Sequence, residues 1–217
     1  YRKLFLLGRT LIFTVDVSAA GCGCNSAIYL VAMSEPHASD SNYCDIQSGA
    51  NACLEFDLLE SSRKAIQTTL HSQTGTGPGA CNEWGCAVNY GKVNNKRYGQ
   101  HASAHDAIDS ARPYNVSASF DDDGRAEVVV TQGGKAPLVM WNVTLAGNCR
   151  HGVPKPAIAA AKDALRRGMV LATSLWSAND MSWLDGGCSS AYPHCDIRKA
   201  SATFSNLQLS DSRRRLR

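Results

Sequence analysis

Short segments in which apolar and polar side chains alternate recur along most of the chain. In residues 11–18, Leu, Phe, Val and Val alternate with Ile, Thr, Asp and Ser. Successive side chains of a strand point to opposite faces, so this pattern is typical of a β-strand with one buried and one solvated face. Runs of the same kind, bounded by Gly, Pro, Asn or Asp, predict further strands at residues 27–33, 126–131, 138–145, 169–175 and 202–209. Such a chain must bury its apolar strand faces by packing one sheet against another.

One segment has the pattern of a helix. Residues 156–167 are rich in alanine, begin with proline and carry two arginines in the last turn, and Gly168 follows directly. Proline near the start, basic residues at the end and glycine just beyond are typical helix boundaries. Many strands with one short helix predict an all-β protein with a β-sandwich fold.

The chain length sets the expected domain organisation. A chain of 217 residues with 44% hydrophobic content can build one large core, and all-β domains often span about 200–250 residues. We expect a single sandwich domain over residues 1–210 and a solvated basic tail over residues 211–217. The stretches 72–112 and 177–200 are rich in Gly, Ser, Asn and Cys and are predicted to be long loops, which often carry binding groups.

Charge and cysteine content indicate a secreted protein. The net charge is only +3 and basic residues cluster in the tail, which disfavours nucleic-acid binding. Nine cysteines and the sequons at Asn115 and Asn142 predict disulfides and N-glycosylation in an oxidising compartment. The sequence has no apolar run of about 18 residues, so no membrane span is predicted. It opens at Tyr1 without a methionine or a signal peptide, so we expect the natural start to lie upstream.

Three carboxylates stand in the pattern E-x-D-x-x-E, at Glu55, Asp57 and Glu60, within an otherwise apolar segment. A buried carboxylate is costly, so this placement suggests chemistry. In a strand, Glu55 and Asp57 share a face, while Glu60 has the opposite parity and joins them only if a β-bulge intervenes. Retaining glycosidases use two carboxyl groups about 5–5.5 Å apart, one as nucleophile and one as acid and then base. The pattern predicts a glycosidase site, and the alternative is an edge strand with solvated acids.

The segment E-F-D-L-L-E-S at residues 55–61 resembles the catalytic strand of the family 7 glycoside hydrolases, the cellobiohydrolases and endoglucanases of fungal type, which commonly reads E-M-D-I-W-E-A. The similarity continues in order along the chain, with V-D-V-S and C-G-C-N-S-A-I-Y within 15–29, Y-C-D-I-Q at 43–47, G-M-V-L and S-L-W within 168–176, W-L-D at 183–185 and F-S-N-L at 204–207. The chain resembles roughly the C-terminal two-thirds of a family catalytic domain with shortened loops. This resemblance implies a concanavalin-like jelly-roll β-sandwich without the family's N-terminal strands, which would leave edges exposed.

The resemblance also implies roles for individual residues. Glu55 matches the nucleophile, Asp57 its hydrogen-bonding assistant and Glu60 the acid/base. Substrate-binding positions of the family are matched by Tyr29, Asp45, Gln47, His71, Trp176 and Trp183. Taken alone, a single histidine is usually structural and two tryptophans in a sandwich are often core; the motif favours cleft positions, where flat rings complement glucose. The implied ligand is a cellulose-like β-glucan chain, with no cofactor and no metal.

The resemblance further implies a disulfide pattern. Cys44–Cys53 is the best matched bridge and Cys86–Cys149 the next, while Cys81 is left as the odd thiol. A further pairing joins Cys22 or Cys24 to Cys188 or Cys195, and the sequence leaves these alternatives open.

Some positions depart from the family pattern. Ala52 and Ser48 stand where the family has another cysteine pair, and Gln73 replaces the family partner of Cys81. Leu59 replaces the tryptophan of the catalytic strand and an arginine near Tyr90 is missing, so contacts on the leaving-group side are expected to differ. An upstream segment or a partner chain is expected to complete the sandwich.

Other functions were weighed against the glycosidase. A zinc site from Cys22, Cys24, Cys81, Cys86, His101 and His105 is disfavoured because no C-x-x-C occurs and the spacing is irregular. The two histidines are expected on a solvated loop, and no cysteine has the context of a nucleophile. The main prediction is a retaining endo-β-1,4-glucanase with an open cleft, because the loops are short. The alternatives are a β-1,3 or mixed-linkage glucanase of the same clan, and a non-catalytic glycan-binding or extracellular structural protein; glycan linkage stays open.

Overall fold

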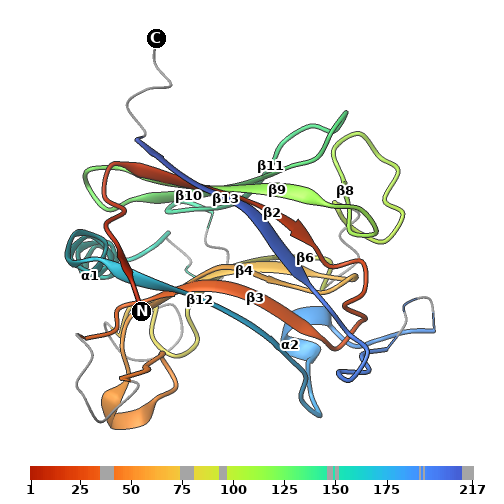
Figure 1. Cartoon of the computed structure of the whole chain (residues 1–217), viewed down its shortest axis with the longest axis horizontal. Coiled ribbons are helices and arrows are strands. Elements are labelled where there is room, and N and C mark those ends of the chain that lie inside the picture. Colours follow the sequence, from red (N-terminus) through yellow and green to blue (C-terminus); the bar gives the residue numbers. More distant parts are fainter. Residues whose placement is uncertain are drawn as a thin grey trace.

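The computed structural model describes residues 1–34, 42–73, 81–92, 97–145, 149, 152–190, 192 and 194–211. The strands of these residues form two stacked antiparallel sheets (Figure 1). The six-stranded sheet has the order β1 (Lys3–Leu4), β12 (Met169–Trp176), β3 (Asn25–Val31), β4 (Glu55–Ser61), β5 (Ile66–His71), β6 (Cys86–Tyr90). The five-stranded sheet has the order β11 (Leu138–Asn142), β10 (Ala126–Thr131), β9 (Tyr114–Phe120), β2 (Arg9–Asp16), β13 (Thr203–Asp211). A short parallel pair, β7 (Tyr98–Gly99) and β8 (Ile108–Asp109), lies outside both sheets.

This architecture confirms the predicted all-β jelly-roll sandwich. The alternating segment at 11–18 is β2, in which Leu11, Phe13 and Val15 are buried and the residues between them are less so. The six ranges predicted as strands from alternation all contain observed strands, and the range 126–131 coincides with β10. Alternation is reliable here because each sheet has one face on the core.

Aromatic side chains join the two sheets in the core. The ring centroid of Phe56 on β4 lies 5.0 Å from that of Trp141 on β11 and 6.1 Å from that of Phe120 on β9. The indole Nε1 of Trp141 also donates a hydrogen bond of 2.8 Å to the carbonyl of Cys86 on β6. One face of β4 therefore packs against the five-stranded sheet. The opposite face of β4 points away from the core and carries polar side chains.

The predicted helix is α1 (Lys155–Arg167), which covers one end of the sandwich. Its buried side chains are mainly alanines, and Leu165 packs into the main core. Gly168 ends it with a φ of 89°, and the chain passes directly into β12. The structure adds α2 (Ser182–Asp185) and a 3₁₀ turn at Gly49–Asn51, so the expectation of a single helix was incomplete.

Two sequence expectations about loops were wrong. The range 72–112 contains β6, β7 and β8, and the range 177–200 contains α2. The strands β5 and β9 were also not predicted. β9 does alternate, but one of its buried positions is the small Ala118, and Ser117 and Ser119 between the buried positions are half-buried, so the apolar signal is weak. β6 is five residues long, pairs with β5 at the edge of the sheet and has one fully buried residue, so its apolar signal is also weak.

The cysteines link loops that are far apart in the chain. Cys22 pairs with Cys188 and Cys24 with Cys195, so both cysteines of each segment are bonded and the pairing that the sequence left open is given by the structure. Cys44 and Cys53 are also bonded, with Cα atoms 5.7 Å apart.

A cluster of three sulfurs lies at the start of β6. The sulfur of Cys86 is at bonding distance from both Cys81 and Cys149, whose own sulfurs are 3.9 Å apart. A sulfur atom forms one disulfide, so the two bonds are alternatives. The expected Cys86–Cys149 bond is one of these two alternatives, and with nine cysteines in the chain one thiol is left over.

No helix in the described part of the chain is long and apolar enough to cross a membrane. The basic cluster at residues 213–217 lies outside the described residues.

Candidate active site

A bulge in β4 brings the three carboxylates to one face. Tyr29 of β3 pairs with Asp57, while the preceding Ile28 pairs with Leu59, so Leu58 is an extra residue. The pairing with β5 shifts at the same place. Leu58 and Leu59 are both fully buried in the core, which turns Glu60 to the face that carries Glu55 and Asp57. The bulge that the sequence required for Glu60 is present.

These carboxylates line an open cavity of about 310 Å³ on the six-stranded sheet. The strands β3, β4, β5 and β12 form its floor, and the chain segment 43–47 forms a wall. Its lining consists of Asn25, Ala27, Tyr29, Tyr43, Asp45, Ile46, Gln47, Glu55, Asp57, Glu60, His71, Ser174 and Trp176. Every predicted site residue of the catalytic and substrate-binding set therefore lines it, except Trp183.

Glu55 is held by the segment that covers it. Its Oε2 accepts a hydrogen bond of 3.0 Å from the backbone N–H of Ile46. That segment is fastened to the base of β4 by the Cys44–Cys53 disulfide and by a bond from Cys53 N to the carbonyl of Asp45. Burial, followed by the negative field of Asp57, raises the pKa of Glu55, and the Ile46 N–H and His71 oppose the rise.

Asp57 lies between Glu55 and His71 and is only 5% exposed. It shares a hydrogen bond with Glu55, and its Oδ2 lies 3.3 Å from Nε2 of His71. Nδ1 of His71 lies 2.8 Å from the carbonyl of Asn82 and must be the donor, because a carbonyl only accepts. The other ring nitrogen, Nε2, is thus the one that faces Asp57. Burial raises the pKa of Asp57, so this carboxyl group holds a proton more readily than a solvated one.

A glycine permits this arrangement. Gly85 has a φ of 64°, and a Cβ at this position would collide with Thr69 and with the ring of His71. A side chain here would therefore displace His71 from Asp57.

Glu60 is held at both oxygens. Oε1 accepts a hydrogen bond of 2.8 Å from Asn25, and Oε2 accepts one of 3.2 Å from Gln67. Burial and the nearby Asp57 raise its pKa to about 8, against these two hydrogen bonds and His71, which lower it. A carboxyl group with this pKa is protonated at neutral pH and can act as an acid.

Trp176 and Trp183 form a stacked pair at the end of the cavity. Their ring centroids are 6.1 Å apart, with 24° between the planes. Trp176 lines the cavity and is 38% exposed, while Trp183 lies behind it on α2. The expectation of a cleft position therefore holds for Trp176 and not for Trp183.

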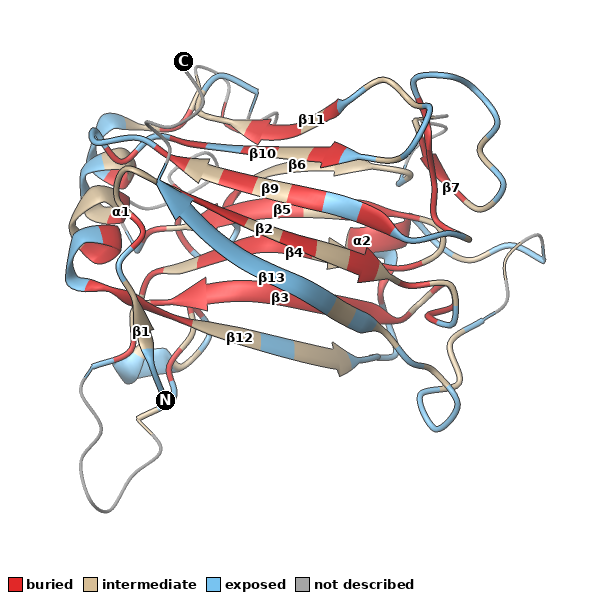
Figure 2. Ribbon diagram, turned by 45° about the horizontal axis from the view of Figure 1, so that its top comes forward, coloured by how far each residue is buried: buried red, intermediate tan, exposed pale blue. Residues whose placement is uncertain are grey.

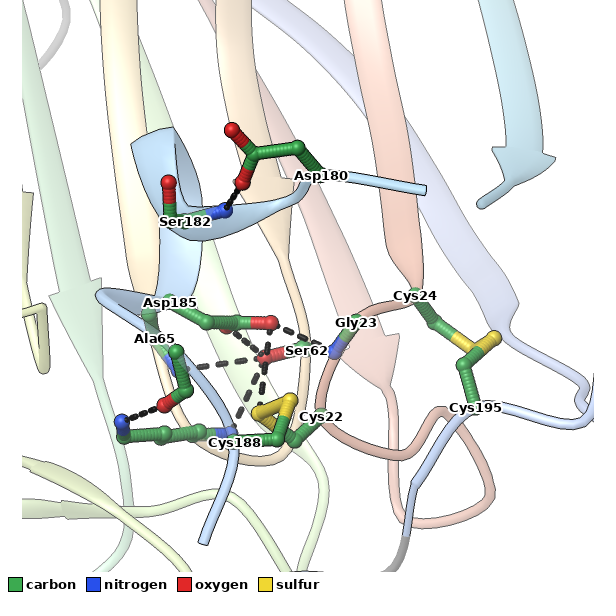
Figure 3. Close-up of a disulfide and its surroundings, with 12 residues drawn as sticks. Cys22, Gly23, Cys24, Ser62, Ala65, Asp180, Ser182, Asp185, Cys188 and Cys195 are labelled. Atoms are coloured by element: carbon green, nitrogen blue, oxygen red, sulfur yellow. Dashed lines mark hydrogen bonds between the residues drawn. A yellow bond between two sulfur atoms is a disulfide. The ribbon is translucent and has the colours of Figure 1, made fainter. Parts of the chain in front are cut away.

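A buried carboxylate anchors α2 and its tryptophan. Asp185 is fully buried, and its oxygens accept hydrogen bonds of 2.5 Å from Gly23 N and 2.7 Å from Ser62 Oγ (Figure 3). Burial raises the pKa of Asp185, and Ser62 and Gly23 oppose the rise. The Cys22–Cys188 disulfide closes the same junction. Three segments distant in sequence are therefore joined next to the cavity.

Sequence reasoning missed several polar residues of this face. Asn25 and Tyr43 line the cavity, and Gln67 donates to Glu60. Asn25 alternates with Ala27 and Tyr29 along β3, so the strand period contained a signal for it. Gln67 had no signal, since β5 itself was not predicted. His101 and His105 are exposed, as expected for a solvated loop.

The chain is similar to known endoglucanases in sequence and to solved cellulases in fold. No family model matches the chain. It is 30% identical over 230 residues to endoglucanase EG-1 of Hypocrea jecorina, across 88% of this chain and 49% of that protein. It is 27% identical over 254 residues to endo-beta-1,4-glucanase celB of Emericella nidulans, across 86% of this chain and 59% of the relative. The chain thus spans about half the length of the first of these relatives.

Solved structures show the same fold. The endocellulase EGI of Humicola insolens superposes with a TM-score of 0.70 at 23% identity, over 98% of this chain and 70% of that one. A family 7 cellobiohydrolase from Daphnia pulex gives 0.69 at 17% identity, over 97% of this chain and 72% of that one.

Proposed function

This chain is a relative of the family 7 glycoside hydrolases, and from that premise we propose that it is a retaining endo-β-1,4-glucanase. The observation that carries the proposal is the bulged β4 strand, which brings Glu55, Asp57 and Glu60 together in one open cavity. Raised pKa values at a cluster of buried acids are typical of catalytic sites.

In the proposed mechanism, the two glutamates have separate roles. Glu60, protonated at neutral pH, gives its proton to the glycosidic oxygen while the carboxylate of Glu55 attacks the anomeric carbon. A glycosyl ester on Glu55 results. Water then attacks the same carbon with Glu60 as base, and the product keeps its anomeric configuration.

Asp57 and His71 assist the nucleophile. The Ile46 N–H stabilises Glu55 as an anion, and Asp57 assists when it holds the proton that the two acids share. Burial and an ionised Asp57 raise the pKa of Glu55 and favour its protonated form. His71 lies 3.3 Å from Asp57 and holds this carboxyl group in place beside Glu55. Asp45, Gln47, Tyr29 and Trp176 are proposed to bind the glucan chain, with Trp183 supporting Trp176 from behind.

An open cavity supports internal cleavage of a polymer over processing from an end. The several disulfides support secretion. We further propose one catalytic-type domain over residues 1–210 and glycans on Asn115 and Asn142. Asn115 is exposed on β9, on the sheet that does not carry the cavity.

The test is proton NMR of the first product formed from a soluble β-1,4-glucan. A β-anomer at early times is expected, with a rapid fall in viscosity that indicates internal cleavage. An initial α-anomer would overturn retention. If the protein hydrolyses β-1,3-glucan and not β-1,4-glucan, the proposed linkage specificity is wrong. If the folded protein hydrolyses no β-glucan, a non-catalytic glycan-binding protein is favoured.

A further inference from the structure

Three strands of the six-stranded sheet carry a row of hydrogen-bonded side chains that ends at Glu60. Glu60 on β4 is paired in register with Gln67 on β5, and Gln67 with Asn89 on β6. Residues paired directly across antiparallel strands point to the same face. The three side chains, called here the amide ladder, therefore lie side by side next to the cavity.

The ladder is continuous. Gln67 Nε2 donates to Glu60 Oε2 at 3.2 Å, and Asn89 Nδ2 donates to Gln67 Oε1 at 3.1 Å. Asn89 Nδ2 also donates to the carbonyl of Leu184 on α2 at 3.0 Å. The second hydrogen of Gln67 goes to Thr69 Oγ1 at 3.2 Å. Glu60 is thus connected through two amides to the helix that carries Trp183.

Backbone groups fix the direction of every bond in the ladder. The Leu184 carbonyl can only accept, so it requires the NH₂ end of Asn89. The backbone N–H of Lys92 can only donate, and it donates to Asn89 Oδ1 at 3.1 Å. Asn89 is therefore held at both ends, its remaining N–H faces Gln67 Oε1, and Gln67 must turn its NH₂ group to Glu60.

Asn25, on the other side of Glu60, is not held in this way. Its Oδ1 is buried and has no hydrogen-bond partner among the described residues. Its amide can therefore reverse when Glu60 gains a proton, and then accept instead of donate. Gln67 cannot reverse while Asn89 faces it. Of the two amides on Glu60, only Gln67 is a fixed donor.

We propose that Asn89 is a positioning residue for the acid/base: it sets the direction of the Gln67 amide, which gives the Glu60 carboxylate a permanent donor. The proposal rests on the proposed function for its catalytic meaning. Burial alone would leave Glu60 too weak an acid to lose its proton readily, and a fixed donor favours the ionised form. The Gln67 hydrogen bond is among the groups that lower its pKa.

The other groups around Glu60 do not replace this donor. The charged groups that act on it are Asp57 on its own strand and His71 on β5. Asp45 and Glu55 line the same cavity, while β12 presents Ser174 and Trp176, which do not titrate. A change at Asn89 that keeps these groups in place acts on Glu60 through Gln67 alone.

The experiment measures the pKa of Glu60 directly, by ¹³C NMR of the side-chain carboxyls in protein labelled at its five glutamates. The Glu60→Gln variant assigns the signal. Asn89→Leu and Gln67→Leu, both neutral, should each raise the pKa of Glu60 by about one pH unit. In the Gln67→Leu background, Asn89→Leu should add nothing, because its effect passes through Gln67.

Gln208→Leu is the matched control, since Gln208 is an exposed glutamine on β13, and it should leave the pKa of Glu60 unchanged. An unchanged pKa in folded Gln67→Leu, or a full effect of Asn89→Leu without Gln67, would overturn the proposal. The second outcome would leave Asn89 as a simple brace for α2. If Asn89→Leu does not fold, Gln67→Leu still tests whether the hydrogen bond from Gln67 lowers the pKa of Glu60.

In the active enzyme, the alkaline limb of kcat/KM against pH should move upward with the pKa of Glu60 in both variants. The titration needs no turnover. A protein that hydrolyses no glucan but shows the shift would refute the proposed function and leave the ladder intact.

Discussion

The two sheets each present a polar face, and the two faces use their side chains differently. On the five-stranded sheet, hydroxyls and amides bond locally, as in Thr10–Ser119 at 3.0 Å and Thr14–Asn115 at 2.8 Å, and Glu127 is exposed. β13, at the edge of that sheet, is exposed along almost its whole length (Figure 2). On the six-stranded sheet, Asp57 is buried and Glu55 and Glu60 are half-buried, and hydrogen bonds connect Glu60 to side chains on the neighbouring strands. The difference arises from the cover: segment 43–47 lies over one face, and no described segment closes over the other.

This comparison teaches that alternation produces a polar face but does not make it a site. A carboxylate acquires a raised pKa only where other elements remove its water. The predictions below test that difference, from the largest expected effect to the smallest.

The acids of the cleft face should be essential and those of the outer face dispensable. Glu55→Gln and Glu60→Gln should each lower kcat by about 10³-fold or more, because each removes a separate chemical role. Glu127→Gln on β10, the same chemical change on the other face, should leave kcat unchanged. Initial rates on soluble β-1,4-glucan, with circular dichroism to verify folding, measure this. Full activity of Glu55→Gln would show that this acid of the cleft face is as dispensable as Glu127 on the outer face.

Asp57→Asn should cost less, on the order of 10²-fold in kcat, because Asp57 assists Glu55 and does not react. The amide keeps the size of the side chain but cannot hold the proton that the two acids share. The acidic limb of kcat/KM against pH should also move to lower pH, because the negative charge of Asp57 raises the pKa of Glu55 and this charge is lost. A loss as large as that of Glu55→Gln would instead assign Asp57 a direct chemical role.

The cleft face should also make stability depend on pH. The folded-state pKa of Glu60 is raised from 4.5 to about 8, so its contribution to stability is complete below about 4.5 and is lost as the pH rises through about 8. Tm should fall between pH 5 and pH 8. Glu60→Gln should reduce this fall and be more stable than the parent at pH 8.

The outer-face control is again Glu127→Gln, whose Tm difference from the parent should be the same at both pH values. If the Tm of Glu60→Gln falls with pH as much as that of the parent, a group other than Glu60 causes the fall.

The smallest effect is expected for a single hydroxyl of the outer face. Ser117→Ala on β9 should change the free energy of unfolding by less than about 0.5 kcal/mol, because water replaces the lost group. Thr68→Ala should cost more, about 1–3 kcal/mol, because Thr68 is fully buried and its Oγ1 donates to the carbonyl of Leu58 within the bulge. Chemical denaturation measures both. Equal costs would mean that the buried hydroxyl contributes no more than the one on the outer face.

Much of this molecule follows from local patterns in the sequence. Alternation in residues 11–18 and 126–131 and the boundaries of 156–167 predicted β2, β10 and α1, because each of these elements meets the core along one face or stripe. The spacing of Glu55, Asp57 and Glu60, with its mismatch in parity, predicted both a site and the need for a bulge.

The tertiary structure decided the rest. Leu58 and Leu59 both enter the core, and only the core packing makes the bulge that turns Glu60 to its neighbours. Gln67 and Asn89 reach Glu60 through strand pairing between β4, β5 and β6, and no local pattern encodes which strands are neighbours. Trp183 lies behind Trp176 because Asp185 and two disulfides anchor α2 there. The sequence by itself determined which residues are able to carry the chemistry, since side-chain type and strand period are local properties; their burial, register and pKa depend on segments far away in the chain, which only the folded sandwich brings together.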